Sequence, residues 1–436
     1  MPAIPADPEV SRNFAREVVR RLRAAGHEAL WAGGCVRDEL LGRVPADYDV
    51  ATSAQPAAVR LLFGQRRTLA VGAAFGVITV VGPRQAGHVE VTTFRTDAAY
   101  TDGRHPAGVT FSTPQEDAQR RDFTINGLFL DPESGRVDDY VGGQADLASG
   151  VVRAIGVPAL RFGEDHLRML RAVRFAAAFG FLLEEGTRSA IVRMAPLVRS
   201  VSPERIAAEL RTMLSRPGRQ RALELLAETG LMQVVFPEWS PMGEECKADR
   251  GGNPVAKSAW LEGARMVGAL EEPGLPAALA MLSLEAEEET VAQIAMRLRL
   301  SNRESKTATW LHAALQEFQG ATATAGPAER PWSQIQPWLA HPDAPLLADC
   351  LRARAAHGAG SPATAAWVCA QLNRPREQLD PPPLLGGADL LGAGIPAGRA
   401  VGQLLANIRA LQLDGGLHSR EEAIEWATQQ APPNGS

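Results

Sequence analysis

Residues 31–52 read WAGGCVRDELLGRVPADYDVAT and combine two adjacent glycines, an arginine and two aspartates one residue apart. At Gly33 and Gly34 the absence of side chains lets backbone N–H groups approach an anion closely. Arg37 follows at a distance that adds a charged hydrogen-bond donor. We therefore expect this segment to bind the phosphates of a nucleotide.

Asp47 and Asp49 alternate with apolar residues, as side chains do along a β-strand. A strand would place both carboxylates on one face, roughly 7 Å apart at about 3.3 Å per residue. Mg2+ prefers oxygen ligands and leaves coordination positions to substrate phosphates, and two such ions can promote in-line phosphoryl transfer. Asp-x-Asp alone is more often a solvated turn, but the glycine pair and Arg37 favour a magnesium site here.

Glu90 is a candidate third carboxylate for the same site. It lies in HVEVTTF, residues 88–94, whose strict alternation predicts a neighbouring strand with Glu90 and Thr92 on one face. An exposed strand glutamate explains this residue equally well.

A helix expected over residues 115–130 contains the next candidates, Arg121 and Asp122, within the segment RRDFTINGLFLD at 120–131. Arg121 is placed to meet a triphosphate, and Asp122 to accept a hydrogen bond from a ribose hydroxyl. Their spacing alone favours a surface ion pair.

A second helix, expected from Glu164 to Phe179, places Asp165 and Arg168 on one face because they are spaced i, i+3. A carboxylate beside a guanidinium presents an acceptor next to donors. Cytosine and adenine complement that order, since each has an exocyclic amino donor beside a ring-nitrogen acceptor. On sequence alone an intrahelical salt bridge is the simpler explanation. Arg171 and Arg174 continue the face as candidate phosphate or base-stacking contacts.

Four segments in order carry a family resemblance: GGCVRDELLGRVPADYD, RRDFTINGLFLD, DDYVGGQADL and GEDHLRMLRAVRFAAAFG. They closely resemble the motifs of class II tRNA nucleotidyltransferases, the bacterial CCA-adding enzymes and their poly(A) polymerase relatives. The resemblance is dense in the first half of the chain and loose in the second. It implies template-independent addition of CCA to the 3′ end of tRNA from CTP and ATP, with Mg2+ as cofactor and release of pyrophosphate.

The resemblance also assigns roles to residues. It implies that Asp47 and Asp49 are the catalytic metal ligands, and that the Asp165–Arg168 pair acts as a protein template for CTP and ATP. The nucleotide-binding set that it implies is Gly33, Gly34, Arg37, Arg121, Asp122, Asp165, Arg168, Arg171 and Arg174.

Related activities share these motifs. A poly(A) polymerase, or an enzyme that adds only A or only CC, remains the main alternative, and a catalytically inactive RNA-binding protein is a remote one. Residues 95–113 are polar and rich in glycine, proline and histidine, which predicts a mobile loop. CC-only members of the family lack the corresponding element, so the loop favours A addition.

The expected fold class is α+β, with a polymerase-beta-like mixed sheet and helices followed by an elongated all-α half. We expect a catalytic head at 1–150, a helical neck for nucleotide selection and RNA binding at 151–240, a helical body at 241–375 and a tRNA-binding tail at 376–436. None of the eight histidines is followed by aspartate, so the body is not expected to be a His-Asp phosphohydrolase. The sequence does not specify an oligomeric state.

Composition agrees with a globular protein. The chain of 436 residues has 45% hydrophobic and 22% charged residues and a net charge of −5, which argues against a generally basic RNA-coating protein. Residues 161–221 are nevertheless basic, with twelve arginines against six acids, or +6. No apolar run reaches the roughly 18 residues of a membrane-spanning helix, and no secretory signal is evident, so we expect a cytoplasmic protein. The four widely spaced cysteines are expected to be free thiols.

Overall fold

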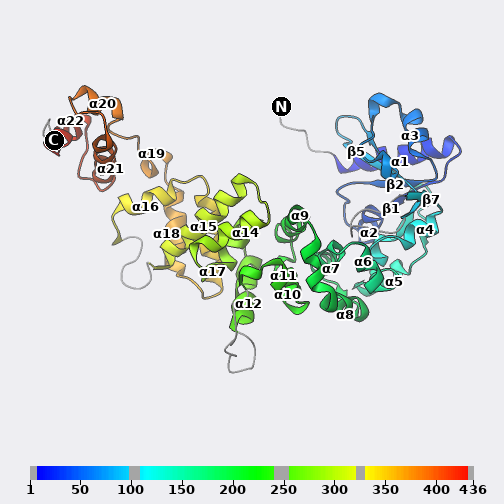
Figure 1. Cartoon of the computed structure of the whole chain (residues 1–436). Coiled ribbons are helices and arrows are strands. Elements are labelled where there is room, and N and C mark those ends of the chain that lie inside the picture. Colours follow the sequence, from blue (N-terminus) through cyan, green and yellow to red (C-terminus); the bar gives the residue numbers. More distant parts are fainter. Residues whose placement is uncertain (1–6, 98–108, 240–254, 321–328, 431–436) are drawn as a thin grey trace. The chain divides into compact units, whose positions relative to one another are not determined.

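The computed structural model describes residues 7–97, 109–239, 255–320 and 329–430. The chain divides into two compact units, residues 1–213 with 221–237 and residues 214–220 with 238–436. The first unit combines a mixed sheet with helices, and the described elements of the second are all helices (Figure 1). The expected α+β class is therefore confirmed. The division into head, neck, body and tail stays a prediction.

A seven-stranded sheet of order β3-β4-β5-β2-β1-β8-β9 forms the core of the first unit. Among the strand pairs of this sheet, β2–β5 is parallel and the others are antiparallel, and the β2–β5 register places Asp49 directly opposite Glu90. Two short ladders, β6–β7 and β10–β11, lie outside this sheet. The strands are β1 (Ala29–Ala32), β2 (Asp49–Thr52), β3 (Thr68–Leu69), β4 (Val77–Val81), β5 (His88–Thr93), β6 (Arg95–Asp97), β7 (Val109–Phe111), β8 (Leu128–Leu130), β9 (Val137–Asp139), β10 (Val151–Val152) and β11 (Leu182–Leu183).

Residues 8–25 carry apolar residues at helical spacing, which predicts one amphipathic helix. Helix α1 (Pro8–Ala24) confirms this and covers part of the sheet. It is capped by Asp7, whose side chain accepts from the backbone N–H groups of Glu9 and Val10. Its apolar face, including the fully buried Val18 and Leu22, packs against β1, β2 and β5. Helix α3 (Pro56–Phe63) packs beside it on β4 and β5.

The first unit contains further helices between and after the strands of the sheet. They are α2 (Gly34–Leu40), α4 (Pro114–Gln119), α5 (Gly143–Ser149), α6 (Pro158–Glu164), α7 (Leu167–Phe179), α8 (Glu185–Met194), α9 (Pro203–Leu214), α10 (Arg219–Glu228) and α11 (Leu231–Val235), with 3-10 turns η1 (Gln65–Arg67), η2 (Ala73–Phe75), η3 (Thr124–Asn126) and η4 (Ala195–Ser200). The 3-10 turn η5 (Pro237–Trp239) begins at the last residue of the first unit and continues into the second.

The second unit contains two groups of helices that pack together. Helices α13, α14, α15 and α17 pack against one another, while α20, α21 and α22 enclose a separate cluster around Leu390, Leu404 and Ile408. The helices are α12 (Val255–Gly268), α13 (Leu275–Leu282), α14 (Glu288–Arg297), α15 (Asn302–Gly320), α16 (Trp332–Leu339), α17 (Ala344–Ala356), α18 (Pro362–Leu372), α19 (Arg376–Leu379), α20 (Gly387–Gly392), α21 (Arg399–Leu413) and α22 (Arg420–Gln430). No helix in the described ranges has the length and apolar character needed to cross a bilayer.

The helix expected over 115–130 is wrong. Helix α4 ends at Gln119, and Phe123 is extended because it bridges to Ala154, after which η3 and strand β8 follow. Backbone pairing with a segment about thirty residues away has overridden the local helical pattern.

The helix expected over 164–179 is also wrong in its first turn. Asp165 has an extended conformation (φ −150°, ψ 107°) that separates α6 from α7. Its carboxylate accepts from the N–H of Leu167, so the side chain serves as a cap instead of continuing the helix.

Smaller differences affect the segment that includes the two aspartates. Strand β2 begins at Asp49, so Asp47 precedes the strand that was expected to hold both residues. Helix α2 begins at Gly34, because Gly33 (φ +74°) makes a tight turn directly after β1. Of the loop expected at 95–113, β6 and β7 form its two ends, and residues 98–108 lie outside the described residues.

The contact between α5 and η3 predicts a steric effect on stability. A Cβ added at Gly143 would lie 2.2 Å from the carbonyl oxygen of Thr124. We expect Gly143→Ala to destabilise the first unit by about 1 to 3 kcal/mol, as overpacking does. The matched control is Gly163→Ala in α6, where an added Cβ meets nothing within 4 Å and should stabilise by about 0.5 to 1 kcal/mol. Urea unfolding of both variants would measure this, and equal midpoints would contradict it.

Candidate active site

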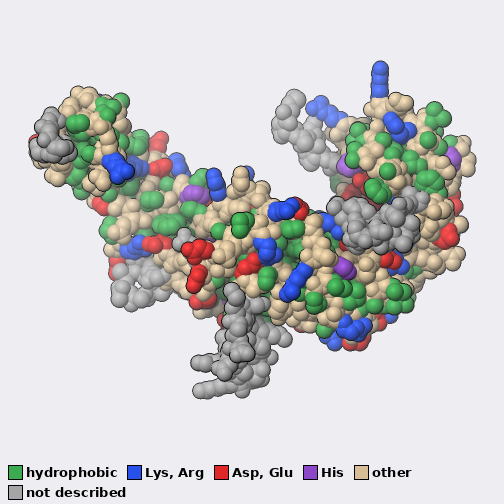
Figure 2. All heavy atoms as spheres, viewed as in Figure 1, with side chains coloured by type: hydrophobic (Ala, Val, Ile, Leu, Met, Phe, Trp, Pro, Cys, Tyr) green, Lys and Arg blue, Asp and Glu red, His purple; other side chains and the backbone are tan. Residues whose placement is uncertain are grey.

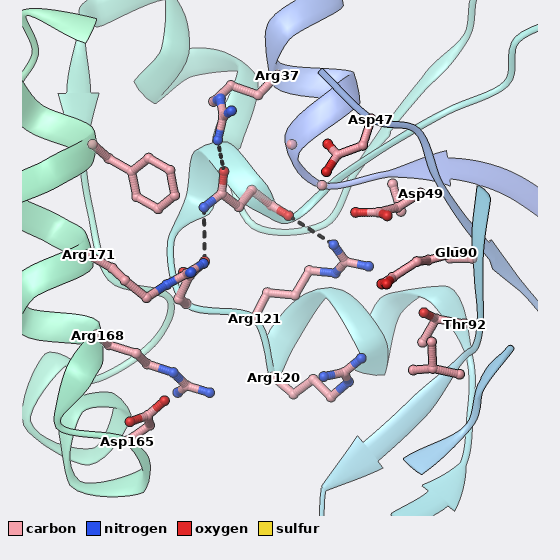
Figure 3. A pocket seen from close by; sticks show the side chains of 18 of the residues that line it. Arg37, Asp47, Asp49, Glu90, Thr92, Arg120, Arg121, Asp165, Arg168 and Arg171 are labelled. Carbon is pink, nitrogen blue, oxygen red and sulfur yellow. Dashed lines mark hydrogen bonds and ion pairs between the residues drawn. The ribbon is translucent and has the colours of Figure 1, made fainter. Parts of the chain in front are cut away.

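One cavity of about 620 Å³ in the first unit is lined by all the site residues predicted from the sequence. Figure 3 shows Asp47, Asp49 and Glu90 on one side of it and Asp165, Arg168 and Arg171 on the other, with Arg121 between them. The cavity is also lined by residues that the sequence reasoning did not select, among them Val77, Thr92, Arg95, Arg120, Asn126, Phe175 and Arg205. The structure thus brings the predicted residues together, while their roles stay predictions.

The acidic side of the cavity is built by the parallel β2–β5 pair. Asp49 begins β2, Glu90 lies opposite it on β5, and Asp47 lies just before the strand. Burial, together with the negative charges of Asp47 and Glu90, raises the pKa of Asp49 to about 7, against the opposing effect of Arg121. This accumulation of negative charge favours binding of a cation.

The carboxylates do not form a complete metal cage. Among the residues with described side chains, no three His, Cys, Asp or Glu residues are grouped so that they could hold a metal ion. Mg2+ characteristically binds through one or two carboxylates together with substrate phosphates. The arrangement is therefore compatible with a metal whose coordination is completed by substrate.

The glycine pair serves the site differently from the way the sequence predicts. The N–H of Gly33 donates to the carbonyl of Leu128 (3.1 Å), so it is not available to an anion. A Cβ on Gly33 would lie 2.7 Å from Nη1 of Arg121. The residue therefore has to be glycine both for its positive φ and because the Arg121 guanidinium occupies the space of a side chain.

Arg37 is more deeply buried than an arginine that only contacts a phosphate needs to be. Only 8% of it is exposed. Its Nη1 donates to Oδ1 of Asn126 (2.7 Å) and its Nε to Asp38 (2.9 Å). The guanidinium also lies over the rings of Phe175 and Phe179, 5.2 and 4.6 Å from their centroids. These contacts fix Arg37 at the edge of the cavity.

The carboxylate of Asp122 is buried and saturated with donors. Its Oδ1 accepts from the N–H of Phe123 (2.8 Å) and from Nδ2 of Asn126 (3.0 Å), and its Oδ2 accepts from Nε and Nη2 of Arg171 (2.9 and 2.6 Å). Although burial opposes ionisation, Arg171 and Asn126 lower the pKa of Asp122 to about 2. A ribose hydroxyl would bind this carboxylate only by displacing one of the donors.

Arg121 is not paired with Asp122, as its spacing suggested, but with Asp117 (3.0 Å between Nη2 and Oδ2). Asp117 is almost fully buried and also pairs with Arg120 (2.7 Å). Because one carboxylate holds both guanidinium groups, Asp117 fixes the two arginines that line the middle of the cavity.

The expected pairing of Asp165 with Arg168 is not formed. Arg168 instead donates to Glu164 and to the carbonyl of Arg161, and Asp165 accepts from Nη2 of Arg205 at 2.7 Å. The break between α6 and α7 separates the two side chains from the i, i+3 geometry of a continuous helix. Both residues still line the cavity.

Further along α7, Arg174 pairs with Glu209 of α9 (2.6 Å) and lies over the Phe175 ring, 4.1 Å from its centroid. Asn126, Arg205 and Glu209 are therefore structural partners of predicted site residues, and sequence reasoning missed them. Asn126 gave a local signal, because it lies within RRDFTINGLFLD. Arg205 and Glu209 gave none, since their partners are 40 and 35 positions away.

The basic stretch 161–221 is less cationic in space than its +6 count suggests. Many of its arginines are paired, including Arg188 with Glu185 and Arg221 with Glu228. Over the face seen in Figure 2, basic and acidic side chains are interspersed. Three of the four expected free thiols, Cys35, Cys350 and Cys369, are free cysteines, and Cys246 lies outside the described residues.

Two family models match the chain. Residues 29–153 match the poly A polymerase head domain, and residues 180–242 match the probable RNA and SrmB-binding site of polymerase A. The first match contains the three carboxylates, Arg37 and the Arg121–Asp122 segment.

Curated proteins that are similar to the chain include CCA-adding enzymes. The CCA-adding enzyme of Geobacillus kaustophilus (strain HTA426) is 46% identical over 219 residues, which are 50% of this chain and 53% of that enzyme. The CCA-adding enzyme of Geobacillus thermodenitrificans (strain NG80-2) is 44% identical over 228 residues, 52% of this chain and 55% of that enzyme. The chain thus spans about half the length of the curated relatives it matches.

Solved structures extend the likeness over the whole chain. The crystal structure of Bacillus stearothermophilus CCA-adding enzyme in complex with CTP has a TM-score of 0.75 and 29% sequence identity, covering 96% of this chain and 97% of that chain. The Thermotoga maritima CCA-adding enzyme complexed with tRNA_CCA shares the fold, with a TM-score of 0.64 and 20% identity over 96% of this chain and 94% of that chain.

The saturated Asp122 predicts a specific dependence of stability on pH. Its pKa is lowered from 3.8 to about 2 in the folded protein, so its contribution is complete above the unfolded value and is lost as pH falls toward the folded one. We expect Asp122→Asn to cost about 2 kcal/mol of unfolding free energy at pH 7, and the difference from the unmodified protein to fall to about half at pH 3. Urea unfolding at both pH values would measure it. The exposed Glu17→Gln in α1 is the control. A pH-independent difference for Asp122→Asn would contradict the prediction.

Proposed function

We propose that the chain is a tRNA nucleotidyltransferase, starting from the match of residues 29–153 to the poly A polymerase head domain. It adds C, C and A to the 3′ end of tRNA from CTP and ATP, without a nucleic-acid template, and releases pyrophosphate. The observation that carries the proposal is a single cavity with a cluster of carboxylates on one side and Asp165 with Arg168 on the other. Phosphoryl transfer and monomer selection can then occur in the same cavity.

Enzymes of this family generally depend on a divalent metal, and we propose Mg2+ here. Asp47 and Asp49 would hold it, and the third carboxylate, Glu90, adds negative charge opposite Asp49. Burial and the charges of Asp47 and Glu90 raise the pKa of Asp49, and a bound cation would offset that charge. When bound, the ion supplies Lewis-acid stabilisation of the charge that develops on the transferred phosphate.

The arginines and the glycine turn position the triphosphate in this proposal. Arg121 is held over Gly33 by Asp117 and points toward the carboxylates, where it can donate to phosphate oxygens (Figure 3). Arg37, with Gly34 at the start of α2, closes the same end of the cavity. Arg171, held by Asp122, and Arg174, held by Glu209, present guanidinium groups between this end and the base-selecting end.

Asp165 and Arg168 select the base. A carboxylate oxygen accepts from the exocyclic amino group of cytosine or adenine, and a guanidinium donates to the adjacent ring nitrogen. Uracil and guanine present the reverse order and would leave enclosed polar groups unpaired, which costs about 1 to 3 kcal/mol for each group. The CTP bound by the Bacillus stearothermophilus enzyme supports this choice of substrate class.

The binding partner in this proposal is tRNA. Residues 180–242 match a probable RNA-binding region, and the helical second unit supplies the body and a tail at 376–436 for further contacts. We also propose that the protein acts in the cytoplasm. A poly(A) polymerase, or a relative that adds only A or only CC, remains the alternative, because the cavity residues are compatible with each of these activities.

The carboxylates give the first test of the chemistry. We expect Asp47→Ala and Asp49→Asn each to reduce nucleotide incorporation by at least about 10³-fold, since phosphoryl transfer would lose a metal ligand, while tRNA affinity stays within a few-fold. The matched control is Asp138→Asn, a carboxylate of β9 that pairs with Arg136 instead of lining the cavity. Incorporation of radiolabelled CMP and a filter-binding assay would measure the two properties. Turnover within a few-fold of the unmodified protein would exclude the assigned metal ligands.

The choice among related activities has its own test. Three tRNA transcripts, ending before CCA, after CC and after CCA, would be incubated with CTP, ATP or both. We expect extension of the first by three nucleotides and of the second by one A, with little extension of the third. Long A tails would identify a poly(A) polymerase, and a product that stops after CC, or extension of the second transcript alone, would identify a CC-only or A-only enzyme.

A further inference from the structure

We propose that Arg205 is a positioning residue for base selection: it fixes the Asp165 carboxylate in the orientation in which that carboxylate accepts from an incoming base. This inference rests on the proposed function and adds to it a determinant from a different helix, α9, outside the segment that contains Asp165 and Arg168.

The geometry around Asp165 carries the proposal. Because Asp165 lies in the extended break between α6 and α7, no regular helix constrains its side chain. Two contacts do so instead, one to each carboxylate oxygen. Oδ1 accepts from the N–H of Leu167 at 3.1 Å, and Oδ2 accepts from Nη2 of Arg205 at 2.7 Å.

The ion pair between Asp165 and Arg205 is largely shielded from solvent. The Asp165 and Arg205 side chains are 16% and 23% exposed, and both residues line the cavity. An ion pair in such a place is screened less than a surface pair, and a charge-assisted hydrogen bond also restricts direction. The pair therefore limits rotation of a carboxylate that borders the space where a base would bind.

Helix α9 makes a second contact of the same kind one turn later. Glu209, four residues after Arg205, pairs with Arg174 of α7 at 2.6 Å. Helix α9 thus supplies a cation, Arg205, to Asp165 and an anion, Glu209, to Arg174. Because Arg205 and Glu209 are spaced i, i+4, they lie on the same face of α9, and this face is the one turned toward Asp165 and Arg174.

Loss of Arg205 should weaken selection more than catalysis. A carboxylate held only by the Leu167 N–H can turn away from the position of an exocyclic amino group. Cytosine and adenine would lose a defined acceptor, while uracil and guanine would lose a repulsive contact. The selectivity ratios fall, and the carboxylates on the opposite side of the cavity keep their geometry.

The experiment compares Arg205→Ala, Arg205→Gln and Arg205→Lys with the unmodified full-length chain. The kcat/KM values for CTP and UTP on a transcript ending before CCA, and for ATP and GTP on one ending after CC, give two selectivity ratios. We expect Arg205→Ala to lower both ratios by about 10-fold, which corresponds to loss of one hydrogen bond to a charged group. Arg205→Lys, which retains a charged donor, should recover most of the selectivity.

Two controls keep the outcome interpretable. Arg199→Ala removes an exposed arginine of η4 and should leave both ratios unchanged. Thermal unfolding reports whether each variant is folded, and if Arg205→Ala is unfolded, Arg205→Gln is used for the same comparison. Unchanged ratios in a folded Arg205→Ala or Arg205→Gln variant, or an equal loss of kcat for all four nucleotides, would overturn the role of Arg205. If the unmodified chain incorporates neither CMP nor AMP, the proposed function itself fails.

Discussion

The ion pair between Asp122 and Arg171 joins the two parts from which the cavity is built. Asp122 belongs to the segment that leads into strand β8, and Arg171 belongs to helix α7. Asn126 extends this link, since its side chain donates to Asp122 and accepts from Arg37 beside the glycine turn. A single buried carboxylate therefore links the segment before β8 to helix α7, which carries Arg168 and Arg171.

Most charged groups of the cavity are held by a partner of opposite charge, and the acidic edge is the exception. Asp117, Glu164 and Glu209 hold arginines that line the walls. Asp49, by contrast, has negatively charged neighbours, and its raised pKa reflects both this and its burial. A cavity with fixed guanidinium groups and a cluster of three carboxylates along one edge is suited to a substrate that brings a cation and several phosphates together.

The sequence predicted the central part of the fold because its signals there are local. Helix α1 and strand β5 follow from the periodicity of their apolar residues. The sequence also predicted that Glu90 lies on a strand next to that of the aspartates, and β2 does pair with β5. The parallel direction of the two strands and the register of Asp49 opposite Glu90 were not predicted.

What the sequence did not reveal depends on distant partners. Phe123 leaves the helical conformation because of Ala154, and the environment of Asp165 is completed by Arg205. The i, i+3 spacing of Asp165 and Arg168 predicts a contact that the break in the helix removes. A periodic pattern carries no information about which remote side chain will compete for a carboxylate, so these features became visible only in three dimensions.

Every residue that lines the cavity lies between positions 32 and 205, within the first compact unit. The apparatus proposed for chemistry and for choosing the monomer is thus built, among the described residues, from the first unit alone. Under that proposal, substitutions in the helices of the second unit would leave the residues that choose the nucleotide unchanged.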